Sequence, residues 1–155
     1  MNVRPLTEDD RPWLRQRLLD GWGDESMAGH GELFFPAEHD GFVAGDRAGV
    51  ATYRVVDDAC EVTFIESFEP GRGVGSALLD AVAAEARAFG CSRIWLVTTN
   101  DNTHARGWYE ARGFVMSEVR PGAIDEVRRT LKPTIPERGL EGAPITDEIE
   151  LSLDL

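Results

Sequence analysis

The chain has 155 residues and a formal net charge of −12, a length that fits one domain and a charge that argues against a nucleic-acid-binding surface. No apolar run approaches the length of a membrane span, and the polar N-terminus lacks a signal-peptide core. We therefore expect one cytoplasmic domain over residues 1–155 with no membrane partner. Two cysteines without a Cys-x-x-Cys spacing and three scattered histidines predict small core cysteines and no metal site.

The first half of the chain predicts a helix followed by an antiparallel meander. Residues 1–6 alternate as an edge strand, because Pro5 cannot pair inside a sheet. Thr7 and Asp10 resemble a capping box in front of a helix that runs to about Asp20. The elements predicted next are a broken helix and a loop over 21–39, a hairpin of strands over 41–44 and 49–56, and a third strand over 60–68.

The second half alternates helices and strands. Apolar residues at helical spacing predict a helix from about Ser76 to Phe89, with Gly90 as its C-terminal cap. The remaining predicted elements are a buried strand over 93–99, a helix opened by Asn102 or Thr103 and ended by Gly113, a strand over 114–119, a long excursion over 121–144 with a short helix over 124–130, and a final strand over 145–155.

The segment from Ser67 to Leu79 reads S-F-E-P-G-R-G-V-G-S-A-L-L and joins a strand to a helix. Gly71, Gly73 and Gly75 tolerate positive φ, and the helix that follows adds unpaired amides and the positive end of its dipole. The spacing alone leaves an anion site and a plain tight turn as equal alternatives. It fits neither the dinucleotide pattern G-x-G-x-x-G nor a P-loop, which ends in Gly-Lys-Ser/Thr.

Two motifs in this order resemble those of the GNAT superfamily of N-acetyltransferases. The first is P-G-R-G-V-G at residues 70–75, where the family's acetyl-CoA loop reads Gln/Arg-x-x-Gly-x-Gly/Ala. The second is N-T-H-A at residues 102–105, followed by Tyr109 and Gly113-Phe114. The resemblance spans nearly the whole chain. It implies a single GNAT domain of the α/β (α+β) class, with a central mixed, largely antiparallel twisted sheet of about seven strands and helices on both faces.

The resemblance also implies acetyl-CoA as co-substrate and no metal. Pro70 departs from the family pattern, because proline has no N–H and one customary pyrophosphate contact is lost. Phe68 or its neighbour is expected to supply the backbone amide that polarises the thioester carbonyl. Arg106 and Arg112 could also face phosphates, although ordinary surface arginines are the favoured interpretation. The residues assigned to the cofactor are Phe68, Gly71, Arg72, Gly73, Val74, Gly75, Ser76, Asn102 and Tyr109.

Acetyl transfer to an amine needs a free lone pair on nitrogen and a proton for the departing thiolate. Glu66 is the candidate base, because it lies late in the strand entering the glycine loop, where the family often places one. A solvated strand residue is an equal alternative for Glu66, and a water chain could replace it. Tyr109 matches the family tyrosine near the cofactor sulfur and is the candidate general acid. Further candidates are Glu61 and Glu69 as weaker bases, and His30 and Trp22 as residues lining an acceptor pocket.

The leading hypothesis is an N-acetyltransferase that moves acetyl from acetyl-CoA to a primary amine of a small molecule, by direct attack in a ternary complex. The alternatives are a protein N-terminal or lysine acetylase of the same fold, and a non-catalytic acyl-CoA-binding module. The excursion over 121–144 is expected to border the acceptor site, since long loops are often functional. Dimers are common in the family, which leaves a homodimer open beside a monomer.

Overall fold

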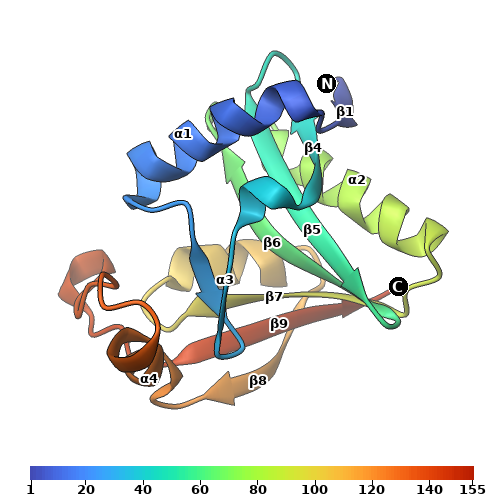
Figure 1. The fold of residues 1–155 in the computed structure, drawn as a ribbon. Helices are drawn as coiled ribbons and strands as arrows, with labels where there is room; N and C mark the ends of the chain where they lie inside the picture. The colour runs from blue at the N-terminus through green and yellow to red at the C-terminus, as the bar shows by residue number, and fades with distance from the viewer. The chain divides into compact units, whose positions relative to one another are not determined.

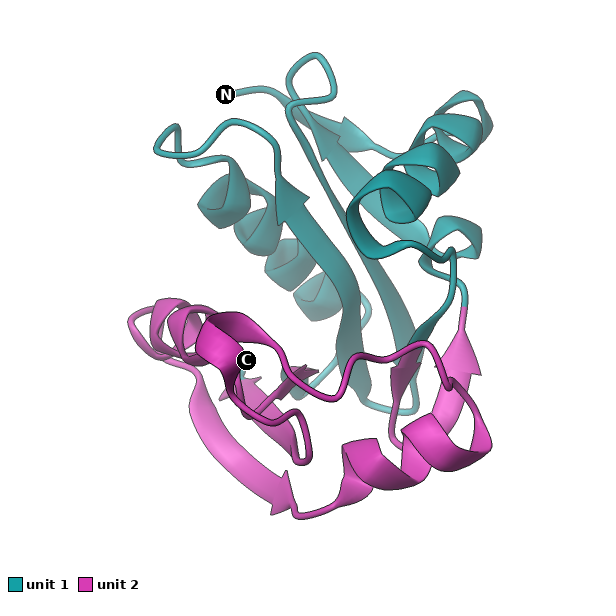
Figure 2. Cartoon of the chain, turned by 90° about the vertical axis from the view of Figure 1, so that its left-hand side faces the viewer, with its two compact units in different colours: residues 1–27, 35–94, 154–155 teal, residues 28–34, 95–153 magenta.

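The computed structural model describes residues 1–155. Its main sheet holds seven strands in the order β1-β4-β5-β6-β7-β9-β8, and β2 and β3 pair separately (Figure 1). Together with four α-helices, this confirms the predicted α/β class with a mixed sheet. The chain divides into two compact units, which Figure 2 colours separately. Unit 1 comprises residues 1–27, 35–94 and 154–155, and unit 2 comprises residues 28–34 and 95–153.

Unit 1 is an antiparallel meander with a helix on either face (Figure 1). On one face, Leu14 and Leu18 pack with Val43, Val50 and Phe64 in a buried apolar cluster. The other face receives α2, which contacts β4, β5 and β6. The elements are β1 (Val3–Pro5), α1 (Arg11–Trp22), β4 (Asp40–Ala44), β5 (Gly49–Val56), β6 (Ala59–Ser67) and α2 (Val74–Ala88), with 3₁₀ turns at Glu8–Asp10 and Pro36–Glu38.

Helix α2 begins two positions before the predicted start. Gly73 adopts the left-handed conformation at its N-cap, with φ of 73°, which only glycine reaches without strain. Gly90, with φ of 80°, follows the helix as predicted. The buried residues of the helix recur at helical spacing and are Val74, Leu78, Leu79, Val82, Ala83 and Ala86.

The prediction of a broken helix and a loop over residues 21–39 was wrong at residues 27–34, which form a β-hairpin. Helix α1 continues to Trp22 and ends at Gly23, and β2 (Met27–Gly29) and β3 (Glu32–Phe34) follow. A two-residue turn joins these strands, with positive φ at both His30 (51°) and Gly31 (73°). Strands of three residues are too short to show alternation, and histidine stands where such a turn usually has asparagine.

Unit 2 contains the hairpin and the C-terminal part of the main sheet. Strand β8 pairs antiparallel with β9 and is an edge of the sheet. Both faces of β9 are buried. Ile149 and Leu151 lie on one face, and Glu148 and Glu150 lie on the other. The elements after the hairpin are β7 (Arg93–Thr99), α3 (Thr103–Glu110), β8 (Val115–Arg120), α4 (Ala123–Thr130), a 3₁₀ turn at Leu140–Gly142, and β9 (Glu148–Asp154).

The sequence also predicted core positions for both cysteines and no segment long and apolar enough to span a membrane. Cys60 and Cys91 are both buried free thiols, as expected for small core residues. None of the helices combines the length and the apolarity that crossing a membrane would require.

Candidate functional site

The glycine loop of unit 1 turns backbone amides outward at the start of α2. Gly71 and Gly73 have φ of 78° and 73°, and a Cβ added to either would meet no atom within 4 Å. Glycine is therefore needed there for its backbone conformation and not for lack of space. The first helical hydrogen bond runs from the amide of Ala77 to the carbonyl of Gly73 at 3.0 Å. The amides of Val74 and Gly75 thus have no partner within the helix, and unpaired amides at a helix N-terminus can bind an anion.

The surroundings of this loop fit a pyrophosphate. Arg72 lies in the turn with a side chain that is 67% exposed, and its ion pair with Glu69 at 3.1 Å is a surface contact. Such a pair is weak enough for a phosphate to displace it. Pro70 is exposed at the loop's outer end, where it removes one amide but disturbs no strand. Gly71, Arg72 and Gly73 thus lie in the loop, and Val74, Gly75 and Ser76 form the first turn of α2.

The predicted carbonyl-polarising amide needs a correction. The amide of Phe68 donates a hydrogen bond to the carbonyl of Ala48 at 2.8 Å, so it is not free for a thioester. The amide of its neighbour Glu69 donates to the Ser67 hydroxyl at 3.4 Å, a length at which a hydrogen bond contributes little. The amide of Glu69 is therefore the better candidate of the two.

Glu66 lies in a half-buried setting on β6, opposite Val50 of β5. Burial raises the pKa of its carboxyl, while the positive charge of Arg17 and the indole N–H of Trp22 offset part of the rise. Arg17 also stacks on the Phe68 ring, with its guanidinium carbon 4.2 Å from the ring centre. Helix α1 thus surrounds this carboxylate with aromatic and cationic groups, and Trp22 is 57% exposed beside it.

The two weaker carboxylate candidates are already paired. Glu61 is buried and accepts a hydrogen bond from Arg54 Nε at 2.7 Å, and Glu69 pairs with Arg72. A carboxylate held by a guanidinium is a poor base, because the cation stabilises its charged form. Glu66, by contrast, is half-buried, and burial raises the pKa of its carboxyl.

Helix α3 of unit 2 carries the second predicted motif. Asn102 caps it, since its side-chain oxygen accepts the amide of Ala105 at 3.2 Å. Tyr109 is 7% exposed and packs edge-on against Trp108 and Phe114. Burial raises the pKa of this phenol well above its ordinary value, although the charge of Arg112 opposes the rise, so the hydroxyl stays protonated at neutral pH.

Arg106 of α3 and Arg112, which follows the helix, both contact residues of α3. Arg106 lies 3.7 Å from Glu110, one turn on. Arg112 stacks over the Trp108 ring at 3.5 Å and donates to the Trp108 carbonyl at 2.9 Å. These contacts agree with the interpretation of both as surface arginines.

A buried polar cluster in unit 2 was missed from the sequence. His30 Nε2 lies 2.8 Å from Glu150 Oε1, and the His30 amide donates to Glu148 Oε1 at 3.0 Å. The imidazole also lies over Trp95, with ring centres 4.5 Å apart and planes 30° from parallel. The E-I-E-L alternation of β9 was the available signal, because it places two carboxylates on one face of a strand predicted to be buried on the other.

Strand β8 completes this cluster. Ser117 donates to Glu150 Oε2 at 2.9 Å, and Arg120 Nε donates to Glu148 Oε2 at 2.5 Å. Arg120 also reaches Glu118 at 2.8 Å and Glu150 at 3.5 Å, while its Nη2 is buried without a partner. Burial raises the pKa of Glu150, but hydrogen bonds from His30 and Ser117 outweigh it, and the net pKa lies below the ordinary value. The carboxylate of Glu150 is therefore ionised at neutral pH.

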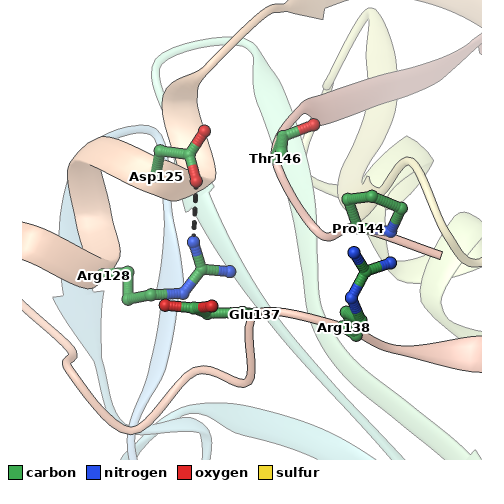
Figure 3. Close-up of a pocket in the computed structure, with 6 residues that line it drawn as sticks. All are labelled: Asp125, Arg128, Glu137, Arg138, Pro144 and Thr146. Carbon is green, nitrogen blue, oxygen red and sulfur yellow. Dashed lines mark hydrogen bonds and ion pairs between the residues drawn. The ribbon is translucent and has the colours of Figure 1, made fainter. Parts of the chain in front are cut away.

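The predicted excursion is an ordered segment with a pocket of about 330 Å³ within unit 2 (Figure 3). Arg128 connects parts of this segment, because it donates to Asp125 at 2.7 Å and to the carbonyls of Ile135, Pro136 and Ile145. The pocket is lined by Asp125, Arg128, Glu137, Arg138, Pro144 and Thr146.

Comparison with known proteins identifies the family of the chain. The model of the acetyltransferase (GNAT) family matches residues 3–114. The uncharacterised protein YdhI of Bacillus subtilis is 37% identical over 98% of this chain and 97% of its own length.

Two solved structures share the fold over 99% of this chain and 99% of their own chains. An IAA acetyltransferase from Bacillus cereus superposes with a TM-score of 0.74 at 18% identity. A Bacillus subtilis acetyltransferase solved in complex with CoA superposes with a TM-score of 0.67 at 19% identity. The chain therefore belongs to the GNAT family of acetyltransferases, whose members use acetyl-CoA and need no metal.

Proposed function

We propose that this protein is an N-acetyltransferase that moves acetyl from acetyl-CoA to a primary amine of a small molecule, by direct attack in a ternary complex. The observation that carries the proposal is the left-handed glycine turn at Gly71 and Gly73, which presents unpaired amides at the N-terminus of α2. That arrangement suits the pyrophosphate of a CoA thioester. We further propose that the chain works in the cytoplasm as one GNAT domain over residues 1–155.

The donor supplies an activated acetyl group as a thioester. The amides of Arg72 to Ser76 would hold its pyrophosphate, with Asn102 and the guanidinium of Arg72 as further contacts. The amide of Glu69 would donate to the thioester oxygen, where negative charge develops during attack. Each of these contacts is made by the backbone or by a side chain outside the core, so none requires the core to rearrange.

The acceptor must arrive as an amine and lose a proton. A lysine-like amine has a pKa near 10.4, so holding it neutral at pH 7 costs about 4.6 kcal/mol. Glu66 can contribute in two ways, either by taking that proton or by attracting the ammonium form with its charge. Its neighbours Trp22 and Phe68 would contact an apolar part of the acceptor, which favours a small amine with a hydrocarbon or aromatic body over a fully polar one.

Tyr109 would stabilise the departing thiolate. Because burial raises its pKa, the phenol remains a hydrogen-bond donor over the working pH range. Complete transfer of its proton to a thiolate, which is a weaker base than this phenolate, would be uphill. We therefore propose that the hydroxyl donates a hydrogen bond to sulfur in the transition state.

A thiol-release screen with acetyl-CoA tests the proposal. The acceptor panel contains polyamines, amino acids, aminoglycosides, arylalkylamines and peptides, with mass spectrometry of each product. Saturable release that yields an acetylated small amine is the expected result. Acetylation of peptides alone would replace the proposal with a protein acetylase. Tight acetyl-CoA binding by calorimetry, with no product from any amine, would replace it with a binding module.

A further inference from the structure

We infer that the pocket of unit 2 is a binding site for a small zwitterion, with the free α-amino acids as its ligand class. Arg138 binds the carboxylate of the ligand, and Glu137 binds its ammonium group. The lining residues all come from the segment between β8 and β9. Occupation of this site needs no acetyl-CoA and goes beyond the proposed acetyl transfer.

The charges that line the pocket leave one anion and one cation for a ligand. Asp125 and Arg128 form an ion pair with each other at 2.7 Å. Figure 3 shows no hydrogen bond or ion pair that joins Glu137 to either of the two lining arginines. Because the Asp125–Arg128 pair is balanced internally, the pocket presents the carboxylate of Glu137 and the guanidinium of Arg138. A ligand with one cation and one anion complements both groups, whereas a singly charged ligand complements only one of them.

The two arginines of the pocket differ in how far they are already engaged. Arg128 donates to three backbone carbonyls of the same segment in addition to Asp125, so most of its five N–H groups are used. Arg138 donates through Nη1 to the carbonyl of Gly142 at 2.9 Å, a neutral partner. A guanidinium has five N–H donors in a planar fork, so this contact leaves donors that match the two oxygens of a carboxylate.

Hydrogen bonds order the backbone around the pocket before a ligand arrives. The amide of Ile145 donates to the carbonyl of Glu137 at 2.9 Å. Asn100 holds the C-terminal part of the segment, because its Oδ1 accepts the amide of Thr146 at 3.0 Å and its Nδ2 donates to the carbonyl of Pro144 at 2.9 Å. A site whose backbone is already ordered loses less conformational entropy when it binds a ligand.

The size and the lining of the pocket favour small polar ligands. Its volume of about 330 Å³ lies at the lower end of the range of about 300–1,000 Å³ that ligand pockets span. Among the lining residues, Pro144 alone has a wholly apolar side chain, and Thr146 adds a hydroxyl. The favoured amino acids therefore have short or polar side chains, such as serine and glutamine, and a large aromatic side chain finds few apolar partners.

Calorimetry of free amino acids with the full chain, in the absence of acetyl-CoA, gives the first test. The probes are L-serine, L-glutamine and L-phenylalanine. Each is compared with its amide, which lacks the carboxylate, and with its N-acetyl form, which lacks the ammonium group. We expect serine or glutamine to bind saturably and more tightly than phenylalanine. The Kd of either derivative should be at least 10-fold higher, because one charge-assisted contact is lost.

Two results of this comparison would overturn the inference. One is that no amino acid binds at millimolar concentration. The other is that a singly charged derivative binds as tightly as the zwitterion, which would leave a site for an anion or a cation only.

Substitutions in the pocket test the two assigned contacts. Glu137→Gln and Arg138→Gln each remove one charge from an exposed residue, so the fold should persist, and an unchanged melting temperature checks this. We expect each variant to raise the Kd of the best ligand by about 10- to 100-fold. Glu137→Gln should remove the advantage of the zwitterion over its N-acetyl form, and Arg138→Gln its advantage over the amide.

Two matched controls carry the same changes outside the pocket. Glu141→Gln and Arg129→Gln also replace exposed charged residues of this segment, and neither residue lines the pocket. Both controls should keep the wild-type Kd. An equal loss of affinity in the controls and in the pocket variants would show that the net charge of the segment, and not the two assigned contacts, governs binding.

Amide chemical shifts locate the bound ligand. In a ¹H–¹⁵N spectrum of the full chain, a saturating amino acid should shift the amides of Glu137, Arg138 and Thr146 most. Changes confined to the glycine loop around Gly71 and Gly73 would overturn the inference. Because none of these measurements contains acetyl-CoA, they decide the amino-acid site whether or not the wild type acetylates an amine.

Discussion

Gly49 of β5 and Val74 of α2 approach so closely that no side chain fits between them. A Cβ added at Gly49 would overlap Cγ1 of Val74 and lie 2.8 Å from the carbonyl oxygen of Glu66. This contact joins the start of α2, which holds the glycine loop, to the strand pair that carries Glu66. The absence of one side chain therefore sets how deeply the loop helix sits on the sheet.

Gly49→Ala should destabilise the protein, because the strand pair and α2 must separate to admit a methyl group. Overpacking of this kind costs about 1–3 kcal/mol, and we expect urea denaturation to report a loss in that range. Because Val74 would shift with the helix, acetyl-CoA affinity should fall as well. Unchanged stability together with unchanged affinity would show that the sheet relaxes freely at this contact.

Gly73→Ala should weaken acetyl-CoA binding more than it weakens the fold. An alanine in the left-handed region costs about 1–2 kcal/mol, and its methyl group would lie on the open side of the loop, where the pyrophosphate is proposed to bind. We expect the Kd from calorimetry to rise at least 10-fold. Gly90→Ala is the matched control, since Gly90 has φ of 80° and open space around it but lies at the other end of α2. Its Kd should stay at the wild-type value.

Tyr109→Phe should lower kcat by about 10- to 100-fold and change the Kd for acetyl-CoA less than twofold, because the hydroxyl is needed only when charge develops on sulfur. In the wild type, the raised pKa of Tyr109 should keep kcat free of a tyrosine-dependent fall up to about pH 10. The chain's other tyrosine, Tyr53, is also buried, with a pKa raised to about 12 by burial. Tyr53→Phe should leave kcat unchanged, and an equal loss in both variants would remove the assigned role.

Asp10→Asn should destabilise unit 1 by about 2–4 kcal/mol. Asp10 is buried and accepts hydrogen bonds from Arg4, Arg47 and the amide of Thr7. The Arg4 hydrogen bond is the largest reason why its pKa lies far below the ordinary 3.8, despite burial. The lowered pKa means that this stability is fully present above about pH 4 and is lost as the pH falls below it.

Thermal unfolding between pH 2 and 7 measures this effect. The wild type should lose stability toward acid, and the variant should show a flatter profile with a lower plateau at neutral pH. The adjacent Asp9 is exposed, so Asp9→Asn removes the same charge and should keep the wild-type slope. If Asp10→Asn loses stability toward acid as steeply as the wild type does, other carboxylates cause that loss.

Local patterns were sufficient for most of the fold. The strand over 93–99 has the predicted bounds, and the caps at Asn102 and Gly90 lie where the sequence placed them. These features depend on side chains close in sequence, through periodicity and capping, and so they can be predicted without knowledge of the tertiary contacts. The hairpin at residues 27–34 was missed because its strands are too short to carry a period.

The candidate site shows the same difference between features set by nearby residues and features set by distant ones. The family and the glycine loop could be predicted from the sequence, because both depend on contiguous motifs whose backbone conformation is local. Which groups are free to act depends on tertiary contacts. The Phe68 amide donates to the Ala48 carbonyl. Glu150 forms a hydrogen bond with His30, which lies 120 positions away in the sequence. Pairings between distant residues follow from how strands pack, and no local pattern in either partner specifies them.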